Sequence, residues 1–186
     1  FYRENCADMA LSTNDIDKKF ISRAKCVCAT GTHLSNVNVE GATIKAISIA
    51  RKLKKKTVLD IDFRPNLWGL SDHNDGENRY IKSSEVTKKL QKNLRLFDLI
   101  VGTEEEFHIA GGINHTIKAL KNVRSLTEAV LVCKRGPYGA SIFENTIKSN
   151  LEKGITGRNF KIEVFNVLGA GDGFMAGFFR GWFKNK

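Results

Sequence analysis

A glycine-rich turn followed by an acid stands out near the end of the sequence, in the stretch NVLGAGDGFMAGFFRGW at residues 166–182. The small residues Gly169, Ala170 and Gly171 would let a phosphate approach the backbone, and the free amides that begin a helix attract an anion. Asp172 follows them in the first helical turn. Its simplest role is to complement the helix dipole, which is worth about 0.3 to 1 kcal/mol. Alternatively, a carboxylate beside a transferable phosphate could orient a hydroxyl group and take its proton during phosphoryl transfer.

The rest of the sequence alternates apolar, β-favouring runs with stretches of helical periodicity. Strands are expected at residues 24–30, 56–63, 97–102, 128–136 and 161–167, and helices at 38–53, 83–94 and 172–182. Because parallel strands need crossover connections, this alternation predicts an α/β fold with a mainly parallel sheet flanked by helices. Such sheets bind ligands at the carboxyl ends of their strands. The polar residues near these ends are Asp62 and Arg64 and those at 102–105, 134–139 and 169–172.

The chain is basic, with a formal net charge of +10 and a pI near 9.5. This charge favours an acidic partner such as a nucleotide, a sugar acid or a nucleic acid. The densest basic run, residues 51–56, ends a helical pattern, where cations favour the helix dipole and the solvent. No aromatic residue is interleaved with this run, as a stacking platform for single strands would require. We therefore expect no nucleic-acid partner.

The cysteine, histidine and apolar patterns argue against other kinds of site. The four cysteines form no CxxC pair and the four histidines lack metal-ligand spacing, which favours buried thiols in a reducing cytoplasm over zinc or disulfides. No apolar run approaches the roughly 20 residues of a membrane span, so we expect no membrane partner. Gly173, Gly177 and Gly181 in the last helix are expected to form a close-packing face.

The stretch NVLGAGDGF resembles the C-terminal signature of the ribokinase-like (PfkB) carbohydrate kinases. This resemblance implies that Asp172 is the catalytic base. It also implies that Gly169, Ala170 and Gly171, with the Asp172 amide, form the anion hole. Asn166 stands where the family usually has an aspartate, near the monovalent-cation site of some members, and this exchange leaves cation activation open.

Two further motifs support the resemblance and imply the positions of ATP and magnesium. The segment VGTEEEF stands where the family has an Asn-x-x-Glu motif that governs magnesium and phosphate, so Glu105 matches the acid, with Gly102 in place of the asparagine. The segment CKRGPYG matches the nucleotide loop of the family. It implies that Lys134, Gly136 and Gly139 lie near the ATP phosphates and ribose.

The substrate expectation comes from three other segments. FYRENCADMAL, DIDFRPNLWGL and VGTEEEFHIAGG resemble those of family members that phosphorylate 5-dehydro-2-deoxy-D-gluconate in myo-inositol catabolism. Related kinases that act on 2-dehydro-3-deoxygluconate use arginines in the corresponding segments to bind the sugar acid, which implies Arg3 and Arg64 here. A guanidinium group offers two parallel donors that suit a carboxylate. The expected reaction transfers a phosphoryl group from magnesium ATP to the C6 hydroxyl of the sugar acid.

The resemblance runs along nearly the whole sequence. It implies that residues 1–186 form the central and C-terminal part of one ribokinase-like kinase domain, with the first strands, the lid and the last helices outside the sequence. The isolated chain is therefore expected to be inactive. A fused aldolase-like domain, found in some bacterial relatives, and homo-oligomerisation stay open. The alternative functions are a 2-dehydro-3-deoxygluconate kinase or another sugar kinase of the family, a basic nucleic-acid-binding protein, and a non-catalytic nucleotide-binding module.

Overall fold

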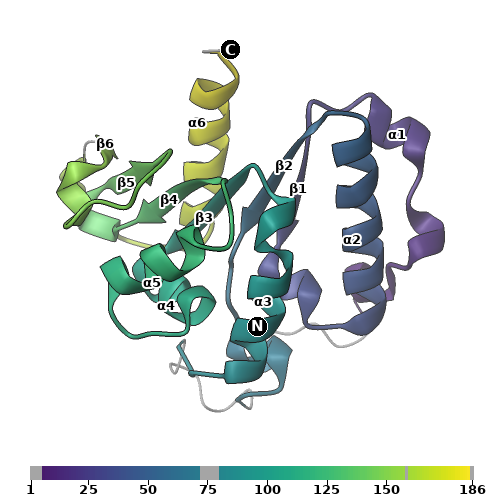
Figure 1. The fold of residues 1–186 in the computed structure, drawn as a ribbon, viewed down its shortest axis with the longest axis horizontal. Coiled ribbons are helices and arrows are strands. Elements are labelled where there is room, and N and C mark those ends of the chain that lie inside the picture. Colours follow the sequence, from purple (N-terminus) through teal and green to yellow (C-terminus); the bar gives the residue numbers. More distant parts are fainter. Residues whose placement is uncertain (1–5, 72–79, 158, 185–186) are drawn as a thin grey trace.

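The structure is a computed structural model that describes residues 6–71, 80–157 and 159–184. Its centre is a six-stranded sheet whose strands neighbour one another in chain order (Figure 1). The strands are β1 (Cys26–Thr30), β2 (Lys56–Asp60), β3 (Leu99–Thr103), β4 (Val130–Lys134), β5 (Ala140–Phe143) and β6 (Ile155–Gly157). Strands β1 to β4 are parallel, whereas β5 and β6 are antiparallel to their neighbours. The predicted α/β fold with a mainly parallel sheet is confirmed.

Helices cover the two faces of this sheet unequally. The α-helices are α1 (Lys18–Ser22), α2 (Val37–Lys52), α3 (Ser84–Asn93), α4 (Glu104–Gly111), α5 (Thr116–Arg124) and α6 (Ala170–Lys184). Short 3-10 turns occupy Ala7–Ala10, Thr13–Asp15, Gly31–Leu34, Pro65–Trp68, Leu94–Leu96, Gly136–Tyr138 and Leu151–Lys153. Helices α2 to α5 pack into the larger core on one face, and α6 packs into a smaller core on the other. Figure 1 shows α6 standing apart from the other helices.

Alternation along the strands divides the buried side chains between these two cores, because successive residues of a strand point to opposite faces. Leu59, Ile100 and Leu131 belong to the larger core, and Val58, Val101 and Val132 to the smaller one. Each large apolar side chain that is fully buried contributes about 1.5 to 3 kcal/mol. Parallel strands buried on both faces produce continuous apolar runs, which is why the sequence predicts them well.

Side-chain caps fix where the helices begin. The Asn36 side chain accepts hydrogen bonds from the amides of Asn38 and Val39 at the start of α2, and Ser83 accepts one from Val86 at the start of α3. Such caps satisfy amides that have no acceptor within the helix. The starts of α2 and α3 therefore follow from local sequence.

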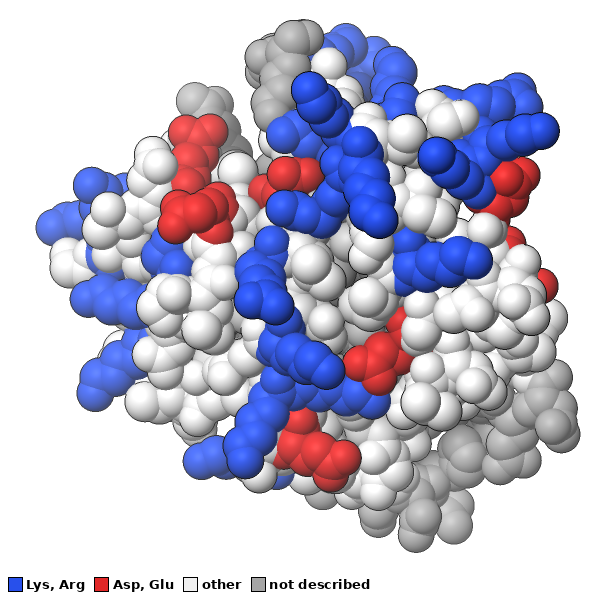
Figure 2. Space-filling view, turned by 45° about the vertical axis from the view of Figure 1, so that its right-hand side comes forward, with Lys and Arg blue, Asp and Glu red and all other residues white. Residues whose placement is uncertain are grey.

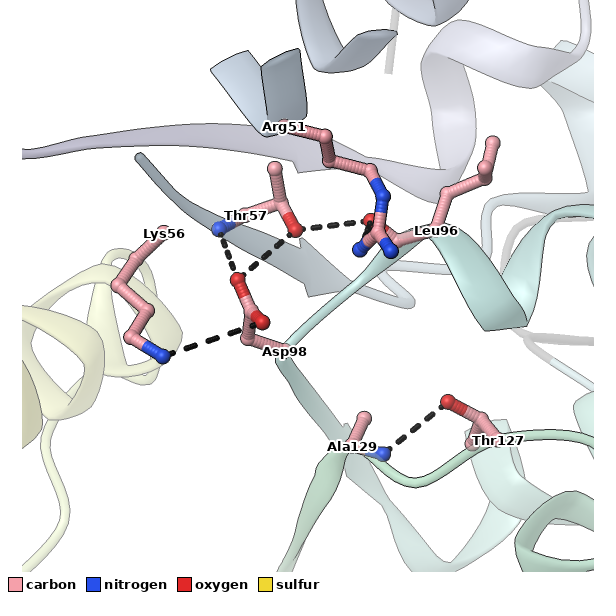
Figure 3. Close-up of polar contacts among 7 residues, drawn as sticks. All are labelled: Arg51, Lys56, Thr57, Leu96, Asp98, Thr127 and Ala129. Atoms are coloured by element: carbon pink, nitrogen blue, oxygen red, sulfur yellow. Dashed lines mark hydrogen bonds and ion pairs between the residues drawn. The ribbon is translucent and has the colours of Figure 1, made fainter. Parts of the chain in front are cut away.

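A group of part-buried hydrogen bonds joins the amino ends of β2 and β3 (Figure 3). Asp98 Oδ2 accepts from the Thr57 amide at 2.8 Å and from the Thr57 hydroxyl at 3.1 Å. The same hydroxyl lies 2.8 Å from the Leu96 carbonyl, to which Arg51 Nη1 also donates at 3.1 Å. These hydrogen bonds join the end of α2 to the amino ends of β2 and β3.

The predictions for the C-terminal region need correction. Residues 161–167 form no strand, because no neighbouring strand pairs with them, and their side chains are exposed. The described residues do not form the expected close-packing contact of α6, since none of their atoms lies within 4 Å of a Cβ added at Gly173, Gly177 or Gly181. The sequence analysis also did not predict the helices α1, α4 and α5 or the strands β5 and β6.

Two further findings concern the cysteines and the helices. The expectation of buried thiols is met by Cys133 alone of the four cysteines, since Cys6 and Cys26 are half-buried and Cys28 is exposed. Burial raises the pKa of Cys133 to about 12. Within residues 6–71, 80–157 and 159–184, no helix combines the length and the apolar character that crossing a membrane requires.

Candidate active site

The carboxyl ends of β2 and β4 bring two opposite charges together. Asp60 ends β2 and Lys134 ends β4, and Lys134 Nζ donates to Asp60 Oδ1 at 3.2 Å. Both side chains are largely enclosed, with exposed fractions of 15% for Lys134 and 13% for Asp60. They lie two residues beyond Val58 and Val132, on the face that α6 covers, because alternate residues of a strand share a face. Burial raises the pKa of the Asp60 carboxyl group, and the charge of Lys134 opposes that rise.

Glu106 places a second carboxylate beside Lys134. Its Oε2 accepts from the Thr103 amide at 2.7 Å, and the Thr103 hydroxyl accepts from the Glu106 amide at 3.2 Å. This capping box at the start of α4 holds Glu106 Oε2 at 4.0 Å from Lys134 Nζ. Burial raises the pKa of Glu106, while Lys134 acts to lower it. Lys134 therefore lies close to two enclosed carboxylates.

The turn that begins α6 presents backbone amides at the same edge of the sheet. Gly169 has a φ of 74°, a left-handed conformation that favours glycine, and its carbonyl accepts from the Gly173 amide at 2.8 Å. The amides of Gly171 and Asp172 precede this bond and have no acceptor within the helix, so they can bind an anion. A Cβ added to Gly171 would lie 3.8 Å from Lys134 Nζ. The lysine and the turn thus border the same space.

Asp172 differs from the other two carboxylates in its surroundings. It is exposed in the first turn of α6, whereas Asp60 and Glu106 are enclosed and already contact Lys134. Its negative charge contributes to the raised pKa of Asp60, so the two groups lie within electrostatic reach of each other. An exposed carboxylate beside free amides leaves room for a hydroxyl group to come within hydrogen-bond reach of it, which a general base needs.

The loop between β4 and β5 lies at the same carboxyl end of the strands. The Arg135 amide donates to the Gly139 carbonyl at 2.8 Å, and Gly136 and Gly139 have φ values of 53° and 80°. Both positions therefore favour glycine. The guanidinium of Arg135 lies over the Tyr138 ring, 5.8 Å from its centroid, and Arg135 Nε lies 3.7 Å from Glu104 Oε1. These contacts give the loop a defined shape directly beside Lys134.

Asp62 and Arg64 follow β2. Arg64 Nη2 lies 2.8 Å from Asp62 Oδ1, and Asp62 has a φ of 35°. A positive φ in a residue other than glycine is uncommon and costs free energy, so the surrounding structure must hold Asp62 in place. A carboxylate substrate that binds Arg64 would share its guanidinium group with Asp62.

The structure brings most of the predicted site residues to this one edge. Lys134 and Gly171 border one space, and Asp172 follows Gly171 in the same helical turn. Gly169 and Ala170 lie in the turn beside them, Gly136 and Gly139 shape the loop after β4, and Arg64 follows β2. Glu105 is exposed, and its neighbour Glu106 approaches Lys134 instead. Arg3 lies outside the described residues.

Sequence reasoning did not single out Asp60 and Glu106. The signal for Glu106 was the pattern Thr103-x-x-Glu106, which is typical of a capping box and turns the glutamate back toward the strand end. The signal for Asp60 was its place at the end of an apolar run, two residues before Asp62. Neither signal reveals the lysine that pairs with both acids, because that lysine comes from β4, a distant part of the sequence.

The carboxylates also bear on where magnesium would bind. Across the part of the chain that the structure describes, no group of three His, Cys, Asp or Glu residues is arranged to hold a metal ion. Magnesium usually keeps several waters and binds through one or two carboxylates together with substrate phosphates. Asp60 and Glu106 supply such carboxylates next to the anion-binding turn. The residues present therefore fit a magnesium ion that arrives with a nucleotide.

Comparison with known proteins gives one family and a set of named relatives. The family model described as pfkB family carbohydrate kinase matches residues 1–186. A 5-dehydro-2-deoxygluconokinase of Geobacillus kaustophilus is 29% identical over 184 residues, which is 97% of this chain and 50% of that protein. One of Listeria monocytogenes is 28% identical over 189 residues, or 100% of this chain and 52% of that protein. The chain thus spans about half the length of the curated relatives it matches.

Solved structures with the same fold are more distant in sequence. A PfkB protein from Polaromonas sp. JS666 superposes with a TM-score of 0.71 at 21% identity, covering 100% of this chain and 55% of that one. An E. coli protein described as a ribokinase II, in complex with ATP and Mg²⁺, gives a TM-score of 0.67 at 18% identity and covers 88% of this chain and 47% of that one. These similarities show that this chain shares the fold of the two solved structures.

Proposed function

Because the chain belongs to the pfkB family of carbohydrate kinases, we propose that the whole protein transfers a phosphoryl group from ATP to a sugar hydroxyl group. Residues 1–186 would then form the central and C-terminal part of one kinase domain. The observation that carries the proposal is the meeting of Lys134, Gly171 and Asp172 at one sheet edge, with Lys134 Nζ 3.8 Å from a Cβ added to Gly171. A cation, free amides and an exposed carboxylate are the groups that phosphoryl transfer needs.

Each group has a distinct proposed task. Asp172 accepts the proton of the attacking hydroxyl group as the new P–O bond forms. The free amides of Gly171 and Asp172 stabilise the negative charge of the transferred phosphoryl group, and Gly169 and Ala170 form the turn that presents them. Lys134 exchanges part of its contact with the buried carboxylates for a phosphate oxygen. Gly136 and Gly139 let the neighbouring loop approach the nucleotide closely.

Magnesium would neutralise charge on the phosphates. The sequence motif assigns its organisation to Glu105, but the geometry favours Glu106, since its carboxylate is enclosed beside Lys134 and Glu105 is exposed. We therefore propose that Glu106, with Asp60, directs magnesium-bound water or phosphate.

For the substrate, we propose 5-dehydro-2-deoxy-D-gluconate, phosphorylated at C6 in myo-inositol catabolism. The names of the relatives that are 28–29% identical support this choice over 2-dehydro-3-deoxygluconate. Arg64 is the proposed partner of the substrate carboxylate, with Arg3 as a second arginine. Because Arg64 already pairs with Asp62 at 2.8 Å, the bound acid would compete with an internal carboxylate.

The test is ADP release by the full-length protein with magnesium ATP and each of the two sugar acids. Turnover with the first acid, lost by about 10² to 10⁴ in Asp172→Asn, is the expected result, because removing a general base costs that much. Asp8→Asn, another exposed acid, serves as a matched control and should keep the full rate. Turnover with 2-dehydro-3-deoxygluconate alone would refute the substrate, and full activity of Asp172→Asn would refute the mechanism.

A further inference from the structure

A strongly basic surface lies at the amino edge of the sheet, opposite the candidate active site. Its residues come from α1, the start of β1 and the end of α2, and we call this surface the basic edge. It consists of Lys18, Lys19, Arg23, Lys25, Arg51, Lys52, Lys54 and Lys55. All of these side chains are exposed except that of Lys55, which is half-buried. Figure 2 shows Lys and Arg side chains gathered in the upper part of the molecule, where Figure 1 places α1 and the starts of β1 and β2.

Backbone pairing makes the basic edge continuous, although its residues are far apart in sequence. The Lys56 amide donates to the Lys25 carbonyl at 3.3 Å, which sets Lys25 beside the Lys54–Lys56 turn. Arg51 reaches the Leu96 carbonyl at 3.1 Å, next to the exposed Arg95. The sequence shows only the run at 51–56, whereas the fold extends it by a second basic segment.

Few acids lie at this surface, although Asp17 caps α1 and its side chain accepts from the Lys19 amide. Glu40 is the single acid between Lys18 and Lys56 in the sequence, and its carboxylate pairs with Lys89 at 2.9 Å. Within the described residues, no ion pair is found for any member of the basic edge. Uncompensated cations on one surface create a positive potential that attracts polyanions and speeds their association.

An exposed aromatic side chain stands within this positive surface. Phe20 is 77% exposed and lies on α1 between Lys19 and Arg23, while its neighbour Ile21 is buried. A phenylalanine exposed to this extent contributes little to the core that residues 1–186 form, and among cations it offers a face on which a nucleic-acid base can stack. The sequence reading rejected a nucleic-acid partner because the run at 51–56 lacks aromatic residues, and the fold supplies one from α1.

We propose that the basic edge binds single-stranded nucleic acid, with phosphates on its lysines and arginines and a base stacked on Phe20. An anionic membrane fits less well, because a helix that lies in a lipid surface needs a continuous apolar face. Helix α1 has five residues and exposes Phe20 alone among its apolar side chains. Double-stranded nucleic acid has no free base for Phe20.

The basic edge and the candidate active site are separate surfaces. Lys25 and Lys55 precede β1 and β2, whereas Asp60 and Lys134 end β2 and β4. A strand of five residues spans about 17 Å, so bound nucleic acid would leave the kinase site open. This proposal does not depend on the proposed kinase function.

The test measures binding of a fluorescent oligothymidylate to the full-length protein by anisotropy, over a range of salt concentrations. If the protein neutralises about four phosphates, the logarithm of the binding constant should fall with the logarithm of salt with a slope near −3. Saturating magnesium ATP should leave binding unchanged, because the nucleotide site is on the other edge. Competition by magnesium ATP, or binding to anionic phospholipid vesicles with none to the oligonucleotide, would overturn the proposal.

Two matched pairs of variants assign the binding to this surface. Lys52→Glu combined with Lys54→Glu should weaken binding at least tenfold and flatten the salt slope, whereas Lys148→Glu with Lys153→Glu makes the same charge change on exposed lysines elsewhere and should have a much smaller effect. Phe20→Ala should weaken binding about tenfold, and Phe20→Trp should retain it. Equal losses in the two lysine pairs, or no loss in Phe20→Ala, would contradict the proposal. Circular dichroism checks that each variant folds.

Discussion

At the scale of single residues, Lys134 organises the candidate site. Its ammonium group lies 3.2 Å from Asp60 Oδ1, 4.0 Å from Glu106 Oε2 and beside Gly171. When both of these enclosed carboxyl groups are ionised, one lysine does not balance their charge. A magnesium ion or a second cation would relieve that charge, which gives a physical reason for metal and nucleotide to arrive together.

The two neighbouring glutamates of α4 allow a matched comparison. If Glu106 helps to organise magnesium, Glu106→Gln should raise the magnesium concentration for half-maximal rate about 10- to 100-fold, the usual effect of losing an outer partner of a metal. Glu105→Gln removes an exposed carboxylate one position away and should change little. Magnesium titrations of ADP release by the full-length variants measure both. A larger increase in this magnesium concentration for Glu105→Gln than for Glu106→Gln would assign the magnesium role to Glu105.

Glu106 should also influence how stability depends on pH. Its pKa is raised above the ordinary value of 4.5, so the folded state holds this proton more tightly than the unfolded chain does. The stabilising contribution is therefore fully present below about pH 4.5 and is lost as the pH rises through the folded-state pKa. Urea unfolding at a series of pH values should show this loss in the wild type and a weaker one in Glu106→Gln. Glu105→Gln, as the control, should follow the wild type.

At the scale of elements, the close contact between α4 and α5 depends on Gly111. A Cβ at Gly111, the last residue of α4, would lie 2.6 Å from the Cα and the carbonyl oxygen of Ala119 in α5. Because this clash involves backbone atoms, Gly111→Ala should lower the free energy of unfolding by about 1 to 3 kcal/mol. Gly41→Ala in α2 meets only Thr13 Cγ2 at 3.4 Å and should be neutral or stabilising by up to about 1 kcal/mol. Urea denaturation compares the two substitutions.

The contact between β2 and β3 gives a second test at this scale. Asp98→Ala would leave the buried Thr57 amide without its acceptor and should cost about 1 to 3 kcal/mol (Figure 3). Asp98→Asn keeps an acceptor oxygen and should cost less. Lys56→Met removes only the half-exposed partner at 3.9 Å and should change stability by under about 1 kcal/mol. Thermal or urea unfolding of the three variants would show whether the hydrogen bonds or the ion pair matter.

The same elements show what sequence alone can predict. The buried strands β2, β3 and β4 were found because both of their faces are apolar, and α2 was found from its periodicity and its Asn36 cap. The strand expected at 161–167 failed because strand pairing depends on a neighbour, which local pattern does not encode. Lys134 and Asp172 were identified from their motifs, but the contacts of Lys134 with Asp60 and Glu106 depend on three separate strand ends meeting.

At the scale of the whole molecule, the two ends of the parallel strands carry different groups. The carboxyl edge gathers the groups proposed for phosphoryl transfer, and the amino edge carries the uncompensated basic surface. Within the described part of residues 1–186, helices α2 to α5 bury the larger core on one face, whereas α6 packs on the other, where Cys28 of β1 is exposed. The proposed catalytic turn therefore belongs to the less covered face.

This uneven cover leads to a prediction about residues 1–186 produced alone. Residues 159–169 are exposed and include the large apolar side chains of Phe160, Ile162, Phe165 and Leu168. Helix α6 packs against the sheet through one buried side chain, Met175, and through four that are only partly buried, namely Phe174, Phe178, Phe179 and Trp182. We expect the isolated chain to keep the circular dichroism of an α/β fold, to bind an apolar dye, and to release no ADP with magnesium ATP and either sugar acid, because little holds the turn before α6 in place. The full-length protein, assayed in parallel, is the control. Turnover by the isolated chain at a rate near that of the full-length protein would show that these residues alone hold Asp172 and Lys134 in working geometry.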